Sequence, residues 1–275
     1  KALYAADKLH GTGQVLARDL TEYKEELLKE NIERVGFENI RTQIWDARIP
    51  DERLAESMDV VLCDVPCSGL GIMGKPMCKN LIKAGHDLIV TTHNPDTLKE
   101  MEALGAKAVH NGKEVAEEAE VIITMLPNSP QVREVALGKG GIIEGGRRGI
   151  VLIDMSSIDP TESKAISAVL AEKGIDMLDA PVSGGEPKAI DGTISVMVGG
   201  KRETFDKYYE LLMNMAGSAV YVGPIGSGNV AKLANQIIVA VNIAAVSEAL
   251  TLATKAGTDP ELVYQAIRGG IAGST

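Results

Sequence analysis

Short apolar runs alternate with amphipathic stretches along most of the chain. The runs have the length of buried strands, and the stretches between them have the period of helices. The predicted strands are Gln14–Arg18, Ile40–Ile44, Asp59–Val65, Leu88–Val90, Val121–Met125, Ile150–Ile153, Met177–Leu178, Thr193–Val198 and Ala219–Val222. Because strands separated by helices pair in parallel through right-handed crossovers, the pattern predicts an α/β fold with a mostly parallel sheet.

Turn and capping residues mark several helix boundaries in this region. A charged helix is predicted over 21–35 and ends before Gly36. Another is predicted over 72–83 and ends before Gly85. The run Asn94-Pro95-Asp96 provides a turn and cap signal for the helix that follows it.

The pattern changes to helix alone near the end of the chain. Apolar residues fill most faces of the segment 230–256, so this helix must be packed on several sides. Polar residues interrupt its most apolar part, 237–250, which is too short to span a bilayer, and we expect a buried helix. The run 226–229 offers an N-terminal cap, and a second helix starts near Asp259. Two helices cannot enclose a core, so we expect a truncated helical domain or one completed by another subunit.

Composition narrows the class of protein. The chain has 275 residues, of which 45% are apolar and 24% charged, as in soluble globular proteins of one or two domains. Its net charge of −10 argues against binding to nucleic acid, which depends on Lys and Arg. Three cysteines are too few for a disulfide framework, and no signal peptide is visible. We therefore expect a cytoplasmic protein with no membrane partner, and a fragment, since the chain begins at Lys1.

A glycine-rich turn, Gly69-Leu70-Gly71-Ile72-Met73-Gly74, follows an apolar run and opens a helix. This G-x-G-x-x-G spacing lets the backbone approach a pyrophosphate at a helix N-terminus, although a plain strand-to-helix turn can have the same sequence. A carboxylate usually ends the next strand and binds the ribose, but here Thr92, His93 and Asn94 follow it. Thr92 or His93 can sit beside a 2′-hydroxyl or a 2′-phosphate, so both NAD and NADP stay open.

A second constellation is the run Asp179 to Gly185. Within it, Ser183, Gly184 and Gly185 can expose consecutive N–H groups that bind an anion, with the serine hydroxyl as a further donor. An ordinary glycine-rich loop is the alternative interpretation.

A third constellation lies in the first turns of the apolar helix. Lys232, Asn235 and Gln236 are spaced to share one helix face. Partial desolvation and the positive end of the helix dipole both predict a lowered pKa for Lys232, which suits a proton donor near neutrality. A surface lysine with an extended stem is the alternative.

Residues 69–275 resemble the β-hydroxyacid dehydrogenase family, and most of all its branch that reduces 2-hydroxy-3-oxopropionate. The matching runs, in the family order, are Gly69–Met77, Ile123–Asn128, Asp154–Ser157, Asp179–Gly185, Gly228–Gln236 and Arg268–Gly270. The resemblance implies a Rossmann-like doubly wound sheet followed by an all-α domain, here truncated. It also implies NAD or NADP as cofactor, a small anionic hydroxy-acid or aldehyde-acid substrate, D-glycerate as product, and a homo-oligomer.

The same resemblance implies roles for individual residues, and none of them is a metal ligand. Residues implied to bind the cofactor are Gly69, Gly71, Ile72, Met73 and Gly74 at the pyrophosphate, Thr92, His93 and Asn94 near the ribose, and Leu126, Pro127 and Ser157 at the nicotinamide. Ser183, Gly184 and Gly185 are implied to hold the substrate carboxylate. Lys232 is implied to protonate the developing alkoxide, supported by Asn235 and Gln236.

Residues 1–69 resemble a different family, the ribosomal RNA cytosine-C5 methyltransferases of the Nol1/Nop2/Sun type. The matching runs are Gln14–Asp19, Trp45–Ala47 and Asp64–Gly69. The resemblance implies that Asp19 and Asp46 contact S-adenosylmethionine. Both families carry the run Ser-Gly-Leu-Gly-Ile near this position, so the chain looks chimeric, with its junction at the glycines.

A chimera leaves three interpretations of function. The preferred one is an NAD(P)-dependent oxidoreductase with a methyltransferase-like segment (1–68), a cofactor-binding domain (69–224) and the start of a helical domain (225–275). The first alternative is an inactive chimeric fragment, because Pro66 ends the incoming strand early and displaces the glycine turn. The second is a methyltransferase remnant, which is disfavoured because the chemistry needs a thiolate and nothing after Cys78 supplies one.

Overall fold

The computed structural model describes residues 6, 13–19, 22–45 and 72–270. The chain divides into two units, Lys1–Cys63 and Asp64–Thr275. The predicted strand Asp59–Val65 lies outside the described residues, as do Gly69 and Gly71.

The first unit contains one strand–helix–strand repeat: β1 (Val15–Asp19), α2 (Glu22–Val35) and β2 (Ile40–Ile44). The two strands pair in parallel over their full length. The hydroxyl of Thr42 on β2 donates to a carboxylate oxygen of Glu25 on α2 at 2.8 Å, which ties the helix to the strand. The predicted strands Gln14–Arg18 and Ile40–Ile44 and the predicted helix 21–35 are confirmed.

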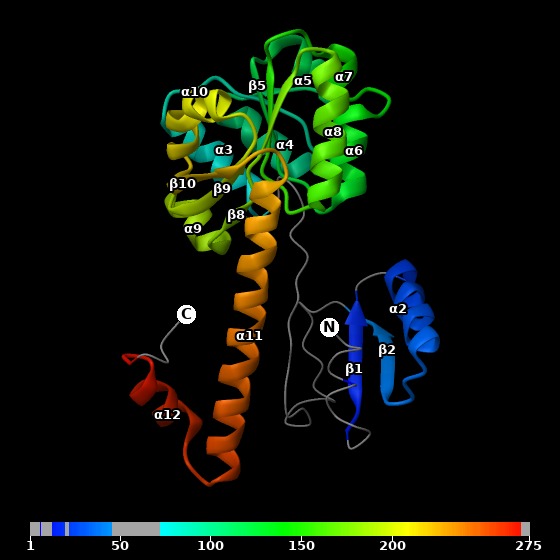
Figure 1. Cartoon of the computed structure of the whole chain (residues 1–275), viewed down its shortest axis with the longest axis vertical. Helices are drawn as coiled ribbons and strands as arrows, with labels where there is room; N and C mark the ends of the chain where they lie inside the picture. The colour runs from blue at the N-terminus through cyan, green and yellow to red at the C-terminus, as the bar shows by residue number, and fades with distance from the viewer. Residues whose placement is uncertain (1–5, 7–12, 20–21, 46–71, 271–275) are drawn as a thin grey trace. The chain divides into compact units, whose positions relative to one another are not determined.

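The second unit is an α/β domain that continues into two helices (Figure 1). Its strands are β3 (Ile89–Val90), β4 (Lys107–Ala108), β5 (Val121–Thr124), β6 (Val151–Asp154), β7 (Asp176–Asp179), β8 (Val182–Ser183), β9 (Ile194–Gly199) and β10 (Ala216–Gly223). Its helices are α3 (Gly74–Lys83), α4 (Pro95–Ala103), α5 (Gly112–Glu118), α6 (Ser129–Leu137), α7 (Ile142–Gly145), α8 (Pro160–Glu172), α9 (Gly185–Asp191), α10 (Arg202–Met213), α11 (Ser227–Lys255) and α12 (Pro260–Ile267).

The sheet has the order β10-β9-β7-β6-β5, with β8 paired to β9. Strands β5, β6 and β7 are mutually parallel, as are β9 and β10, whereas β9 runs antiparallel to β7 and β8. Strands β3 and β4 form a separate parallel pair, and no strand among the described residues joins that pair to β5. The mostly parallel sheet that the sequence predicts is therefore confirmed.

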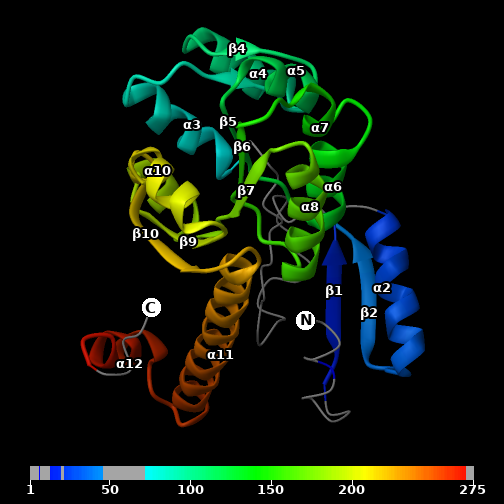
Figure 2. The same ribbon diagram turned by 45° about the horizontal axis from the view of Figure 1, so that its top comes forward.

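Helices cover both faces of this sheet (Figure 2). Along β6 the side chains alternate: Val151 and Ile153 pack in one cluster with α3, α9 and α10, while Leu152 packs in another with α5, α6, α7 and α8. All four residues of β6 are buried, as expected for a central parallel strand covered on both faces. The domain is thus a doubly wound, Rossmann-like fold.

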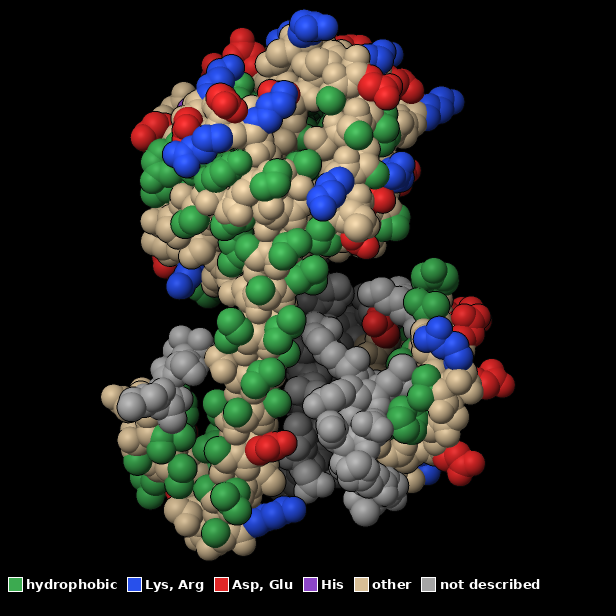
Figure 3. Space-filling model, in the orientation of Figure 1, with side chains coloured by type: hydrophobic (Ala, Val, Ile, Leu, Met, Phe, Trp, Pro, Cys, Tyr) green, Lys and Arg blue, Asp and Glu red, His purple; other side chains and the backbone are tan. Residues whose placement is uncertain are grey.

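The long helix α11 differs from its prediction. Only Gly228 and Asn229, in its first turn, are buried, and its large side chains farther along are exposed, for example Ile237 at 66% and Leu252 at 71%. Figure 3 shows hydrophobic side chains along the length of this helix. The prediction of a buried helix is therefore wrong for the described residues of the second unit, in which α12 contacts α11 while the sheet contacts only the start of this helix.

Helix α11 extends over 29 residues, which agrees with the predicted helix 230–256 and its cap at 226–229. By length and composition it could cross a membrane, which is weak evidence because core helices of soluble proteins meet the same criterion. Its first turn packs against β7, β9 and β10 of the sheet, so its start belongs to the α/β domain.

Candidate active site

Polar residues end three neighbouring strands of the sheet. The last residues of β5, β6 and β7 are Thr124, Asp154 and Asp179, and each pairs in register with its neighbour. All three side chains are buried, and the two Asp residues are fully so. Ligands of open α/β sheets bind outside the carboxyl ends of the strands, so this row lies beneath the expected site.

The Asp154 carboxyl accepts two hydrogen bonds and lies near the charge of Asp179. Its Oδ1 accepts from the Thr124 hydroxyl at 2.8 Å and from the Ser156 backbone N–H at 3.2 Å, whereas Oδ2 has no partner in the described part of the chain. Burial raises the pKa of this carboxyl to about 6, with a further contribution from the charge of Asp179. A buried carboxyl with one unsatisfied oxygen favours its protonated form.

Asp179, at the end of β7, accepts hydrogen bonds from the start of helix α11. Its Oδ1 accepts from the Gly226 N–H at 2.7 Å, and its Oδ2 accepts from the Asn229 N–H at 2.8 Å. These amides belong to the helix N-terminus, whose N–H groups have no partner within the helix. Burial raises the pKa of the Asp179 carboxyl, and these backbone hydrogen bonds oppose the increase. The N-cap residue, Gly226, lies in the expected run 226–229, but the side chain that accepts from this helix end is Asp179, a residue far upstream.

Asn229 fixes the same helix end to the loop after β6. Its side-chain oxygen accepts from the Ile158 N–H at 3.0 Å, and its Nδ2 donates to the Ser163 hydroxyl at 3.1 Å. The residue is only 1% exposed. Helix α11 thus starts at a position fixed by β7, through Asp179, and by the β6–α8 loop, through Asn229.

Lys232 lies one turn farther along α11 and is half-buried. Desolvation lowers the pKa of its ammonium group, in the direction that the sequence predicted. Asn235 is half-buried and donates to the exposed Gln236 at 3.1 Å, and no hydrogen bond links either to Lys232 in the described part of the chain. The structure keeps the three on successive turns of one helix without joining them.

The expected anion-binding turn falls between β8 and α9. Ser183 ends β8, and Gly184 and Gly185 follow with φ angles of 144° and 70°. Residues with a side chain rarely adopt such angles, so both glycines are required by the backbone. Gly184 and Gly185 are exposed, and their backbone is open to a small ligand.

The residues assigned to the nicotinamide half follow two adjacent parallel strands. Leu126 and Pro127 follow β5 after Met125, and Ser157 follows β6, so they share the carboxyl edge of the sheet. The buried hydroxyl of Ser156 accepts from the Leu126 N–H at 2.8 Å, which fixes one loop to the other. The loops after β5 and β6 are therefore joined at this edge of the sheet.

The start of α3 fits the phosphate end of a dinucleotide. Met73 and Gly74 are buried and Ile72 is exposed at the first turn. In the described residues no side chain caps α3, whereas Asn or Asp side chains cap α4, α5, α6 and α8. Uncapped N–H groups at a helix N-terminus suit an anion, so this end of the helix is compatible with NAD or NADP.

The loop after β3 contains the three residues expected near the ribose. Asn94 caps α4 by accepting from the N–H groups of Asp96 at 3.0 Å and Thr97 at 3.2 Å, which confirms its predicted cap. The Thr92 hydroxyl accepts from the Asn94 N–H at 3.3 Å, and His93 is exposed. Asn94 is thus occupied by its helix, which leaves Thr92 and His93 as the side chains better placed for a ligand.

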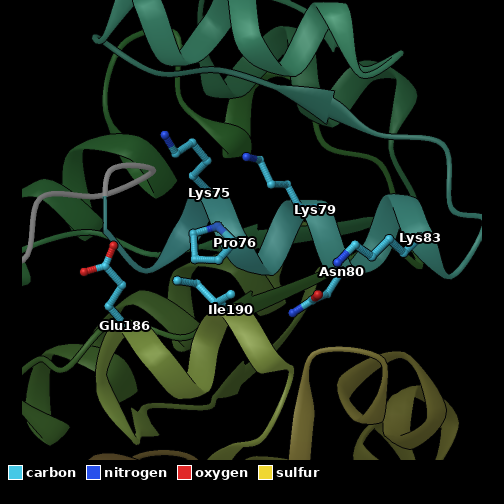
Figure 4. Close-up of a pocket in the computed structure, with 7 residues that line it drawn as sticks. All are labelled: Lys75, Pro76, Lys79, Asn80, Lys83, Glu186 and Ile190. Atoms are coloured by element: carbon cyan, nitrogen blue, oxygen red, sulfur yellow. The ribbon is translucent and has the colours of Figure 1, made fainter.

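A separate groove of about 230 Å³ lies between α3 and α9 (Figure 4). Its lining residues are Lys75, Pro76, Lys79, Asn80, Lys83, Glu186 and Ile190. Lys75 and Lys79 form ion pairs with Glu100 of α4 at 3.0 and 2.6 Å, so two of its cations are already partnered. None of these residues is among those that the sequence predicts for the site.

Sequence reasoning did not assign roles to Asp154, Asp179 or Asn229 individually. Each stands inside a run that carries the family resemblance, and each is polar at a position where the pattern is otherwise buried. For Asp154 and Asp179 the available signal was a buried polar residue at the end of an apolar strand, because such a group needs a partner. Asn229 lies in helix α11 and had no such signal.

Two family models match this chain, one over the α/β domain and one over the helices that follow it. Residues 64–223 match the family model for the NAD binding domain of 6-phosphogluconate dehydrogenase. Residues 226–275 match the model for the NAD-binding region of NADP-dependent 3-hydroxyisobutyrate dehydrogenase.

Three relatives illustrate the similarity. The chain is 48% identical over 206 residues to 2-hydroxy-3-oxopropionate reductase of Escherichia coli, covering 75% of this chain and 70% of that protein. It is 42% identical to mitochondrial 3-hydroxyisobutyrate dehydrogenase of Mus musculus, covering 71% of this chain but only 58% of that enzyme. The solved structure of Mycobacterium tuberculosis 3-hydroxyisobutyrate dehydrogenase with L-serine is 34% identical, with a TM-score of 0.68 over 74% of this chain and 69% of that one. The chain therefore belongs to the β-hydroxyacid dehydrogenase family of NAD(P)-dependent oxidoreductases.

Proposed function

We propose that this chain reduces a small aldehyde acid with NADH or NADPH, and that its substrate is 2-hydroxy-3-oxopropionate, which yields D-glycerate. The observation that supports this most is the anchoring of α11: Asp179 fixes the helix start at the carboxyl edge of the sheet, one turn before the half-buried Lys232. The E. coli relative is named for the same substrate.

In this proposal bound NAD(P)H supplies the hydride. Lys232 donates a proton from Nζ to the substrate oxygen as negative charge develops there, and its lowered pKa favours that transfer. The exposed backbone at Gly184 and Gly185, with the Ser183 hydroxyl, holds the substrate carboxylate. Asn235 and Gln236 support Lys232 from the next turn of α11.

The cofactor would lie along the carboxyl edge of the sheet. Its pyrophosphate belongs at the start of α3, with Ile72, Met73 and Gly74 and with Gly69 and Gly71 just outside the described residues. Thr92 and His93 would flank the ribose, and Asn94 would shape that loop. Leu126, Pro127 and Ser157 would contact the nicotinamide half and exclude water from it.

The remaining proposals concern the whole chain. We propose a cofactor-binding domain over 69–224 and a helical domain that starts at 225. The boundary between them is supported by the two family models, which end at 223 and begin at 226, whereas the first model begins at 64, before the proposed start. Residues 1–68 stay a proposed methyltransferase-like segment, and the parallel β1–β2 pair is compatible with it. A cytoplasmic homo-oligomer without nucleic-acid partners completes the proposal.

One observation favours the competing account, a folded but inactive chimeric fragment. Beyond Lys232 the large apolar side chains of α11 are exposed, so the described residues leave one side of the proposed site uncovered. The methyltransferase remnant has less support, since burial raises the pKa of the Cys78 thiol to about 11 and makes it a poor nucleophile.

Cofactor binding and turnover separate these accounts. The purified chain is heated with NADH, NADPH or S-adenosylmethionine, and reduction of 2-hydroxy-3-oxopropionate is followed by loss of the reduced nicotinamide. The proposal expects stabilisation by NADH or NADPH together with turnover. An inactive fragment would give no turnover, and the methyltransferase account requires stabilisation by S-adenosylmethionine instead.

A further inference from the structure

The segment Asp179 to Gly185 faces two parts of the proposed reaction. Its first residue accepts hydrogen bonds from the start of α11, the helix that carries Lys232. Its last three residues form the turn assigned to the substrate carboxylate. Only Ala180, Pro181 and Val182, all buried, separate the two.

The environment of Asp179 is shaped to hold a carboxylate. A Cβ atom at Gly228 would lie 3.0 Å from Asp179 Oδ2 and closer still to its backbone oxygen, and a Cβ at Gly199 would contact Oδ1. Two glycines therefore leave room for the carboxylate against α11. Burying a charge is unfavourable unless it is well bonded, and this one is bonded to the helix N-terminus.

We propose that Asp179 is a positioning residue that places Lys232 relative to the substrate turn, and that Asn229 extends this placement to the loop that carries Ser157. The inference rests on the proposed role of Lys232. Asp179 holds the backbone of the first turn of α11, and the Asn229 side chain joins that turn to Ile158 and Ser163. The start of the helix that carries Lys232, the strand end that precedes the substrate turn and the loop after β6 are thus joined by hydrogen bonds at one junction.

The charge of Asp179 has a second consequence for Lys232. A negative charge at the helix start offsets the positive end of the helix dipole, which otherwise disfavours the ammonium form. Two other charged groups lie near this junction. Asp154 on β6 lies near Asp179, and the side chain of Lys164 on α8 approaches Gly226. Asp179→Asn removes one negative charge, so the pKa of Lys232 should fall and the alkaline limb of the reductase pH profile should move to lower pH.

The test compares Asp179→Asn with Asp176→Asn, at the opposite end of the same strand, where Asp176 accepts from Lys201 and Thr204. For Asp179→Asn we expect kcat to fall about 100-fold, as for a misplaced catalytic group, with NADH affinity within about twofold of the parent. The pH profile should shift as stated. Asp176→Asn should keep the parent kcat and profile. A parent-like kcat and profile for Asp179→Asn would overturn the inference.

Two further measurements cover a variant that fails to fold and a failure of the proposed function. Asn229→Ser keeps the backbone N–H that donates to Asp179 but shortens the side chain that contacts Ile158 and Ser163, and we expect its kcat to fall about tenfold. If Asp179→Asn does not fold, a parent-like kcat for Asn229→Ser overturns the inference. Amide hydrogen exchange at Gly226 and Asn229 should accelerate in Asp179→Asn, and unchanged exchange also overturns it. If Lys232→Met retains full turnover, the proposed function fails. The exchange measurement still reports whether Asp179 holds the start of α11, because it does not depend on turnover.

Discussion

The Asp179 carboxylate accepts a hydrogen bond from the backbone N–H of Asn229 at 2.8 Å, across 50 residues of sequence. This contact joins the end of β7 to the start of α11 and is buried. It sets where α11 leaves the sheet, and therefore where Lys232 lies.

Gly228 is required by this junction. A side chain there would contact the backbone oxygens of Asp179 and Met197, which cannot move without disturbing two strands. We expect Gly228→Ala to lower the free energy of unfolding by about 1–3 kcal/mol, the usual cost of overpacking. Urea denaturation measures this. Gly269→Ala is the control, since a Cβ there would meet nothing within 4 Å; equal effects of the two substitutions would contradict the packing described.

Asp154 should make stability depend on pH in an unusual direction. Its folded-state pKa is about 6 against 3.8 for an ordinary Asp, so the unfolded chain loses this proton first as pH rises. The protonated Asp154 therefore contributes to the free energy of unfolding in full below about pH 4, and this contribution, about 3 kcal/mol at most, is lost as pH rises through about 6. Asp154→Asn keeps an acceptor for Thr124 and Ser156 but cannot titrate. Urea unfolding at several pH values should show the variant gaining on the parent between pH 4 and 7, and a constant difference would refute this.

Much of the architecture follows from local pattern. The strands β1, β2, β5, β6 and β9 follow apolar runs, and the cap at Asn94 follows from its position before a proline. The exposure of α11 could not be predicted in this way, because apolarity shows that a helix needs a partner but not whether the described chain provides one. The N-cap position of α11 at Gly226 follows from its own first residues, but the hydrogen bonds that Asp179 accepts there could not be predicted, because they are not a local property of the sequence.

The site shows the same limit. Motif spacing proposes Lys232 and the turn at Ser183 as site residues, and in the structure Lys232 lies on α11 and Ser183 ends β8. The roles of Asp154 and Asn229 depend on which strands are neighbours, which emerges only from the sheet order.

Cofactor preference should respond to the loop after β3. Thr92→Asp places a carboxylate where a ribose hydroxyl can donate to it and where a 2′-phosphate would be repelled. We expect the ratio of kcat/KM for NADH over NADPH to rise about tenfold or more. The readout is steady-state kinetics with each cofactor. No change in the ratio would mean that Thr92 is not beside the ribose.

The exposed face of α11 should govern self-association. Ile238 is 61% exposed in the described chain, so in a monomer Ile238→Lys should change stability by less than about 0.5 kcal/mol. Because we propose a homo-oligomer, we expect a larger loss that depends on protein concentration, together with a smaller mass in sedimentation. Parent-like stability and mass at every concentration would show that this face is not covered by a second copy.

Turnover of Lys232→Met tests the central claim most directly. Removing a general acid usually lowers the rate by about 100- to 10,000-fold. Lys255→Met, at the far end of the same helix, is the matched control. We predict that Lys232→Met binds NADH or NADPH as the parent does and loses reduction of 2-hydroxy-3-oxopropionate by that factor, while Lys255→Met keeps it. Full turnover by Lys232→Met would contradict the account.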